Sequence, residues 1–111
     1  QEEDCRVDFA AEQGSQPLIL LLARREVNIR LFAAACIRAA CMNCPESRQD
    51  LHEAQGIKHL LDFLRREQSD EPQDSAATEH ALAAINNACC SHVGNCQDVH
   101  ANEGMLVLTA L

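Results

Sequence analysis

The chain has 111 residues, of which 47% are hydrophobic and only 3% aromatic, and its formal net charge at pH 7 is −8. This length fits a single domain. The acidic balance argues against a nucleic-acid surface, which needs clustered Lys and Arg, and the apolar runs are far shorter than the roughly 18 residues of a membrane span.

A ten-residue segment occurs twice in the chain. Residues 47–56 read SRQDLHEAQG and residues 95–104 read NCQDVHANEG, with a weaker copy, CRVDFAAEQG, at residues 5–14. The closing glycines lie at positions 14, 56 and 104, so the steps between them are 42 and then 48 residues. Self-similarity with a period near 40 residues is typical of helical repeat proteins, in which each unit stacks on the next. We therefore expect binding by an extended surface and no single catalytic cleft.

Each unit is predicted to contain three helices, and the first unit covers residues 1–44. A short helix over residues 6–12, with Phe9 as its apolar anchor, is expected to end at Gly14, because glycine accepts the left-handed conformation beyond a helix C-terminus. The second helix follows, with Pro17 in its first turn. The third helix is the longest. Its apolar residues recur with helical spacing at Ile29, Phe32, Ala33, Cys36, Ile37 and Ala40.

The second unit, residues 45–92, repeats this order. Its short helix spans residues 48–54, and its second helix carries an apolar stripe at Ile57, Leu60, Leu61 and Leu64. The polar, acidic segment over residues 67–75 is interpreted as a solvated surface loop that accounts for the longer second step, and a docking role for its acidic side chains is the alternative. The long third helix then repeats the apolar positions at Ala77, His80, Ala81, Ala84, Ile85 and Ala88.

The third unit, residues 93–111, holds a short helix over residues 96–102 and the start of a second helix, and we interpret it as truncated. About three or more units are normally needed before such a stack is stable alone. The chain is therefore interpreted as a piece of a longer array, whose exposed ends could allow self-association.

Several polar residues recur at equivalent positions of the repeat. His52 matches His100, and Asp50 matches Asp98. Such periodicity indicates structural roles: a helix surface or an inter-helix hydrogen bond for the histidines, and a place near helix N-termini for the aspartates. The pairs Arg24-Arg25 and Arg65-Arg66 are expected to end the two second helices, where cations interact favourably with the helix dipole.

Seven cysteines, an odd number, lie mostly at apolar helical positions, which favours a reduced, intracellular chain. Cys41 and Cys44 form a C-x-x-C pair, but no second pair completes a four-ligand zinc site. In the repeat register Cys41 matches Cys89 and lies near the apolar stripe, so we expect it to be packed. A metal-binding or redox role for these cysteines is the alternative.

The order of a short helix, a glycine, a second helix and a long third helix resembles the armadillo repeat over essentially the whole chain. The match is carried by residues 49–57 (QDLHEAQGI), 60–64 (LLDFL) and 83–88 (AAINNA). The resemblance implies an all-α fold, a right-handed α-solenoid of about two and a half armadillo-like three-helix repeats. The HEAT repeat, with a similar period but usually two helices, is the close alternative.

In armadillo repeats the third helices line a concave groove, where an asparagine commonly binds the main chain of an extended peptide. By position this asparagine is Asn87, whereas its counterpart one unit earlier is Ala39. In the nuclear-import members a tryptophan lies four residues before the asparagine; alanines hold those places here, so we do not expect a receptor for nuclear-localisation signals. The resemblance implies a partner-binding groove, with ordinary solvent-facing residues as the alternative, lined by Arg38, Met42, Asn86, Asn87 and Cys90.

These observations predict a protein–protein interaction scaffold or adaptor of the cytoplasm or nucleus, whose partner is a protein and could be a basic or extended peptide. A regulator of a small GTPase and a chaperone-like client binder are alternatives within the same class, and a cysteine-based metal or redox module is the alternative from another class. The sequence holds no Ser-His-Asp order, phosphate loop or HExxH pattern. We therefore expect no enzyme, no cofactor and no metal site.

Overall fold

The computed structural model describes residues 10–69 and 75–109, and this part of the chain contains α-helices and turns but no strand. The predicted all-α class is confirmed. The predicted helix over residues 6–12 lies mostly outside the described residues, as do Phe9 and the acidic positions 70–74. In chain order the helices are α2 (Ser15–Leu22), α3 (Val27–Ala40), α4 (Pro45–Glu53), α5 (Gly56–Ser69), α6 (Ser75–Cys89), α7 (Val93–Ala101) and α8 (Gly104–Thr109).

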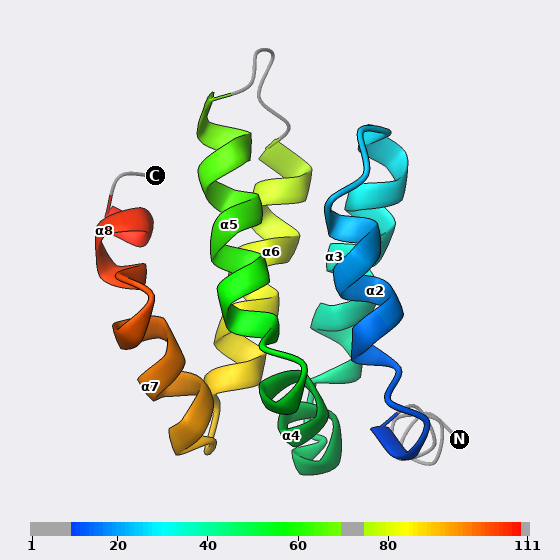
Figure 1. Ribbon diagram of the computed structural model, residues 1–111, viewed down its shortest axis with the longest axis vertical. Coiled ribbons are helices and arrows are strands. Elements are labelled where there is room, and N and C mark those ends of the chain that lie inside the picture. Colours follow the sequence, from blue (N-terminus) through cyan, green and yellow to red (C-terminus); the bar gives the residue numbers. More distant parts are fainter. Residues whose placement is uncertain (1–9, 70–74, 110–111) are drawn as a thin grey trace.

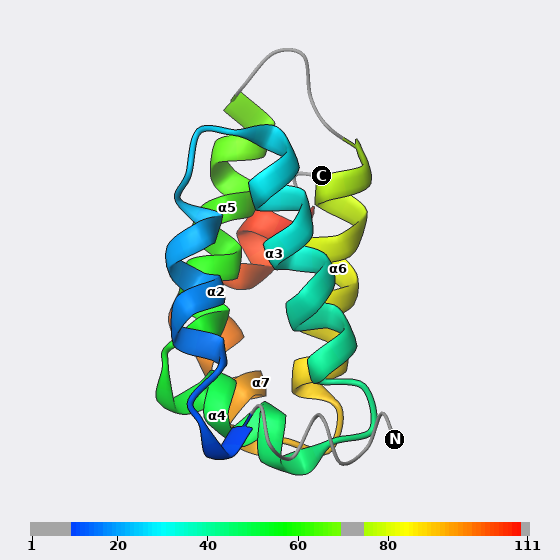
Figure 2. The same ribbon diagram turned by 90° about the vertical axis from the view of Figure 1, so that its right-hand side faces the viewer.

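The longer helices form two layers (Figures 1 and 2). Helices α2 and α5 lie side by side in one layer, and α3 and α6 lie side by side in the other. Helices α3 and α6 run in the same direction and share the most extensive contact between any two helices. The short helices α4 and α7 lie near one end, and α8 packs against α5 on the side opposite α2 (Figure 1).

The core lies between these layers. Helix α5 contributes the largest buried side chains, and the predicted stripe at Ile57, Leu60, Leu61 and Leu64 is fully buried. Small residues, including Ala33, Ala34, Ala81 and Ala84, are buried in α3 and α6, which lets these two helices approach closely. Phe32 departs from the predicted stripe, because its side chain is 60% exposed on α3.

The repeated glycines play a different part from the one predicted. At these turns the left-handed residue is the one immediately before the glycine, namely Gln13, Gln55 or Glu103, and no described glycine has a positive φ. Gly56 and Gly104 are instead the first residues of α5 and α8. The prediction that these glycines adopt the left-handed conformation after the short helix is therefore wrong.

Close packing explains why glycine stands at these two positions. A Cβ atom built on Gly56 would lie 2.1 Å from Leu51 Cδ1, and one on Gly104 would lie 2.6 Å from Val99 Cγ1. Leu51 and Val99 are the equivalent apolar anchors of the two short helices. Each glycine thus lets the chain turn back closely over the anchor of the helix that precedes it.

The acidic segment begins later than predicted. Helix α5 continues to Ser69, so Glu67 belongs to the helix, and its side chain is only 3% exposed. The carboxylate pairs with Arg30 of α3, with 3.1 Å between Nη2 and Oε1. The prediction that Glu67 belongs to a solvated loop is wrong, because a partner 37 residues earlier in the chain draws this acidic residue into the interior.

Candidate functional site

The predicted groove residues Arg38 and Asn87 meet where α3 packs on α6. Asn87 Nδ2 donates a hydrogen bond of 2.9 Å to the main-chain oxygen of Arg38. The Arg38 guanidinium lies 3.2 Å from Nδ1 of His80, and since arginine can only donate, this ring nitrogen accepts. Asn87 thus binds a main chain, as the resemblance implies for such an asparagine, but this main chain belongs to α3 of the same molecule.

The other three predicted residues are exposed and lie apart from this junction. Met42 and Cys90 follow the ends of α3 and α6 and lie in turns, so their prediction as residues of the long helices is wrong. The next residues, Asn43 and Ser91, adopt left-handed φ values of 54° and end the two helices at equivalent positions. Asn86 lies on α6, on the rim of a hollow formed with α7 and α8.

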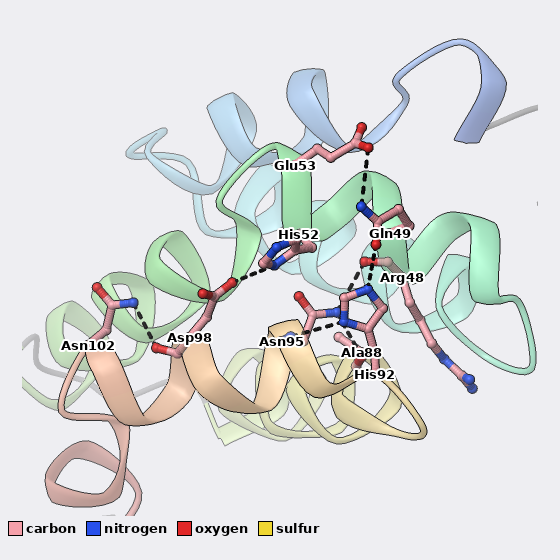
Figure 3. Close-up of polar contacts among 9 residues, drawn as sticks. All are labelled: Arg48, Gln49, His52, Glu53, Ala88, His92, Asn95, Asp98 and Asn102. Carbon is pink, nitrogen blue, oxygen red and sulfur yellow. Dashed lines mark hydrogen bonds and ion pairs between the residues drawn. The ribbon is translucent and has the colours of Figure 1, made fainter.

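A network of polar contacts, which we call the α4–α7 seam, joins the two short helices (Figure 3). His52 Nδ1 lies 2.8 Å from Asp98 Oδ2, and the ring of His92 lies beside that of His52 with 5.3 Å between centroids. His92 Nε2 lies 2.8 Å from Gln49 Oε1. Of the two structural roles predicted for the histidines, His52 has the inter-helix hydrogen bond, and its counterpart His100 is exposed on the surface of α7.

The tautomer of His92 follows from its two contacts. Its Nδ1 accepts a hydrogen bond of 3.0 Å from the main-chain N–H of Asn95, which caps the N-terminus of α7. The proton of the neutral ring therefore lies on Nε2 and is donated to Gln49. Sequence reasoning missed this cap.

Asn95 is the buried centre of the seam and was also missed. Its side chain is 0% exposed, and Nδ2 donates to the main-chain oxygens of Ala88 at 2.8 Å and Arg48 at 3.1 Å. One amide therefore joins α4, α6 and α7. The equivalent residue one unit earlier is Ser47, and this replacement of a short polar residue by a longer one was the available signal.

Beside the seam lies a polar hollow of about 570 Å³, lined by Gln49, His52, Glu53, Gln55, Lys58, Asp98 and Asn102. Its lining carries both acidic and basic groups, among them the His52–Asp98 pair. The lining contains no serine, threonine or cysteine beside the histidine. The described residues therefore provide hydrogen-bonding groups here and no nucleophile for a His–Asp pair to activate.

The predicted places of the periodic aspartates need correction. Asp50 and Asp98 lie in the second halves of α4 and α7, so the prediction that they lie near the N-termini of these helices is wrong. Asp50 nevertheless caps another helix, because its carboxylate accepts a hydrogen bond of 2.9 Å from the main-chain N–H of Ser15 at the start of α2. In this position the negative charge also interacts favourably with the α2 dipole.

The paired arginines also act on neighbouring helices. Helix α2 ends at Leu22, so Arg24 and Arg25 lie in the connection to α3. Arg65 and Arg66 lie within α5, about one turn before its end at Ser69. Arg66 donates to the main-chain oxygen of Leu22 at the end of α2, and Arg65 donates to that of Asn102 after α7. These cations therefore satisfy the free carbonyl groups at the ends of other helices.

The cysteines of the C-x-x-C pair are free and buried. Burial raises the pKa of the Cys41 thiol to about 12, which makes the reactive thiolate unfavourable at neutral pH. Burial, followed by the neighbouring Cys96, likewise raises the pKa of Cys89 to about 12. The prediction that Cys41 is packed is confirmed, and the described residues contain no group of three or more His, Cys, Asp or Glu side chains that could hold a metal ion.

Within residues 10–69 and 75–109 there is no helix with the length and apolar character needed to cross a membrane. No protein-family model, no curated protein sequence and no solved structure matches the chain.

Proposed function

We propose that the chain is an armadillo-like α-solenoid segment of about two and a half repeats that acts as a protein–protein interaction scaffold. Its binding surface is the exposed side of the α3–α6 layer. The partner is a protein segment in an extended conformation, and the net charge of −8 favours a basic one.

The recurrence of backbone features at the spacing of the sequence repeat supports the solenoid. The left-handed residues Gln13, Gln55 and Glu103 are separated by 42 and 48 residues, and Asn43 and Ser91 are separated by 48. The same spacings separate the copies of the repeated ten-residue segment. Equivalent turns therefore precede α2, α5 and α8, and equivalent turns end α3 and α6, as expected for stacked units.

The observation that carries the proposed function is the parallel packing of α3 on α6. The Asn87 amide and the Arg38–His80 contact hold the two helices in a fixed register. Exposed groups remain at both helices, among them Phe32 and Met42 at α3 and Asn86 and Cys90 at α6. A fixed pair of helices with exposed apolar and amide groups suits an extended peptide, whose main chain needs hydrogen bonds and whose side chains need contacts.

Selection from a random peptide library, followed by calorimetric titration of the selected peptides, tests this function. We expect Met42→Ala and Asn86→Ala each to weaken binding by about 2- to 12-fold, which corresponds to one lost contact of about 0.5–1.5 kcal/mol. Both side chains are exposed, so the thermal midpoint should stay unchanged.

Gln16→Ala is the matched control, because Gln16 is an exposed polar residue of α2 in the other layer. The control should bind with unchanged affinity. If the library yields no binder, or if the selected peptides bind the Met42 and Asn86 variants as tightly as the unchanged protein, the α3–α6 surface is not the binding site.

A further inference from the structure

Helix α6 carries a second apolar surface on the side away from α3. We call it the outer face of α6. It consists of Leu82, Ile85 and Cys89 of α6 together with Val99 of α7 and Leu108 of α8, which surround a hollow of about 290 Å³. An adjoining hollow of about 540 Å³ runs along α7 and shares Cys89 and Cys96 with the first. The apolar surface therefore extends from the middle of α6 past its C-terminal end.

The repeat shows what such a surface does one unit earlier. Counting back 48 residues from Leu82, Ile85 and Cys89 gives Ala34, Ile37 and Cys41, which are buried with exposed fractions of 0%, 1% and 1%. Ala34 and Ile37 lie on α3, the helix that packs most extensively against α6, and Cys41 is the residue that follows α3. On α6 itself, by contrast, the side chains of Leu82 and Cys89 are only half-buried.

The outer face of α6 also has a polar residue, Asn86, which has an equivalent on α3. Arg38 of α3 contacts His80 of α6 and accepts the Asn87 hydrogen bond through its main chain, so it lies in the α3–α6 interface. Its counterpart is Asn86, which lies on the rim of the hollow. The outer face of α6 thus presents the positions with which α3 binds α6, and it continues that interface by one further step.

We propose that the outer face of α6 binds one amphipathic α-helix, laid parallel to α6 as α6 is laid on α3. The bound helix presents small apolar side chains, because the bulkier Leu82 stands where α3 has Ala34. It also presents a hydrogen-bonding side chain opposite Asn86. A length of about 15 residues matches α6, the template for this contact.

A second copy of this chain stacked head to tail does not fit the surface. In such a copy α3 would arrive with α2 packed against it. The place that this α2 needs, beside α5 on the side opposite the resident α2, is already held by α8 (Figure 1). The geometry therefore selects a single helix without a second helix attached in that position.

The probe is a synthetic peptide with the sequence of residues 75–89, capped at both ends and labelled with fluorescein, because α6 already fits the equivalent surface of α3. We expect saturable binding by fluorescence anisotropy. Methyl resonances of Leu82, Ile85, Val99 and Leu108 should shift on titration, whereas those of Ile19 on α2, in the other layer, should not.

Leu82→Glu and Asn86→Arg are expected to change peptide binding in opposite directions. Leu82→Glu should weaken peptide binding at least 10-fold, while Leu20→Glu, at an exposed apolar position of α2, should leave it unchanged. Asn86→Arg should strengthen binding several-fold by restoring the arginine that contacts His80 in the α3–α6 interface. A peptide with His80→Ala should lose that gain, which separates a specific contact from a folding effect.

Absence of saturable binding overturns the proposal, as does binding that neither Leu82→Glu nor Asn86→Arg changes. Sedimentation equilibrium of the protein alone gives a further decisive outcome. A dimer that Leu82→Glu converts to a monomer would assign the outer face to a second copy and would overturn the single-helix occupant. Asn86 belongs to both proposed surfaces, whereas Leu82 belongs only to the outer face of α6. The response to Leu82→Glu therefore distinguishes failure of this proposal from failure of the proposed function.

Discussion

At the scale of single residues, the molecule is held together by polar side chains that complete the ends of helices in other units. Asp50 binds the first N–H of α2, Arg66 binds the last carbonyl of α2, and Arg65 binds the carbonyl that follows α7. Each such contact contributes about 0.5–1.5 kcal/mol, somewhat more where the group is charged and buried. Together they fix how one unit sits on the next, which apolar contacts between alanines define less strictly.

Asn95 should be the most sensitive polar residue of the α4–α7 seam. Asn95→Ala removes both hydrogen bonds of Nδ2 and leaves the carbonyls of Arg48 and Ala88 buried without this donor. We expect the free energy of unfolding, measured by urea denaturation, to fall by about 2–3 kcal/mol. Gln97→Ala, at an exposed position of the same helix, should change it by less than about 0.5 kcal/mol. Equal effects of the two substitutions would contradict the seam.

Cys41 should make the protein sensitive to alkaline pH. Its pKa is raised by burial to about 12 in the folded state, so above pH 9 the unfolded chain loses this proton while the folded chain retains it. The stability contributed by the neutral thiol is complete below the unfolded pKa and is lost as pH rises toward the folded value.

Between pH 8 and pH 10 this residue alone should lower the free energy of unfolding by about 1.4 kcal/mol. The chain has no tyrosine, and Lys58 is its only lysine. The pKa of Cys89 is also raised to about 12, and this residue is present in the unchanged protein and in Cys41→Ala alike, so comparison of the two isolates Cys41. Urea denaturation at the two pH values measures the change. Cys41→Ala should be less stable at pH 8 but should lose about 1.4 kcal/mol less between the two values. An identical loss in both proteins would show that Cys41 ionises normally.

At the scale of the elements, the turn between α4 and α5 separates two roles that the sequence seemed to assign to one glycine. Gln55 supplies the left-handed conformation with φ 59°, and Gly56 supplies the space above Leu51. A left-handed φ costs a residue with a Cβ atom about 1–2 kcal/mol, and glycine avoids this cost. Part of that gain is lost, because glycine is more flexible in the unfolded chain.

We therefore expect Gln55→Gly to stabilise the protein by about 0.5–1 kcal/mol and Gly56→Ala to destabilise it by about 1–3 kcal/mol through overpacking. Gln97→Gly, the same substitution inside α7, should instead cost about 1 kcal/mol. Thermal unfolding followed by circular dichroism measures all three. A destabilising Gln55→Gly would return the left-handed role to Gly56.

The sequence predicted the order and type of the helices well, because apolar residues such as Leu60, Leu61 and Leu64 recur with helical spacing. The end of α5 could not be predicted, since Glu67 reads as part of an acidic loop until its contact with Arg30 is known. For the same reason the capping role of Asp50 was missed. Periodicity reports which face of a helix is buried, but it does not report which polar partner another element brings.

The site was less predictable than the fold. Position in the repeat identified Arg38 and Asn87, and these two residues do meet, but their contact joins two helices of one molecule. Asn95 and His92 differ from their counterparts Ser47 and Cys44, so a search for repeated residues overlooks them. These departures from the repeated sequence were the better signal for the α4–α7 seam.

At the scale of the whole molecule, the helices form a compact body. The radius of gyration is 12.9 Å, close to the value of about 13 Å expected for a globular chain of this length. The curvature of a superhelix accumulates by a small rotation at each repeat. In the proposed solenoid, the parallel packing of α3 on α6 is one such step.

The register of α3 on α6 is the central claim, because both proposed binding surfaces are defined by it. A nitrogen-edited nuclear Overhauser spectrum of the protein tests it directly. The side-chain amide protons of Asn87 should show cross-peaks to backbone protons of Arg38 and Ala39, since Nδ2 lies 2.9 Å from the Arg38 oxygen. Cross-peaks from this amide only to protons of α6 itself would contradict the stacking of the two helices in this register.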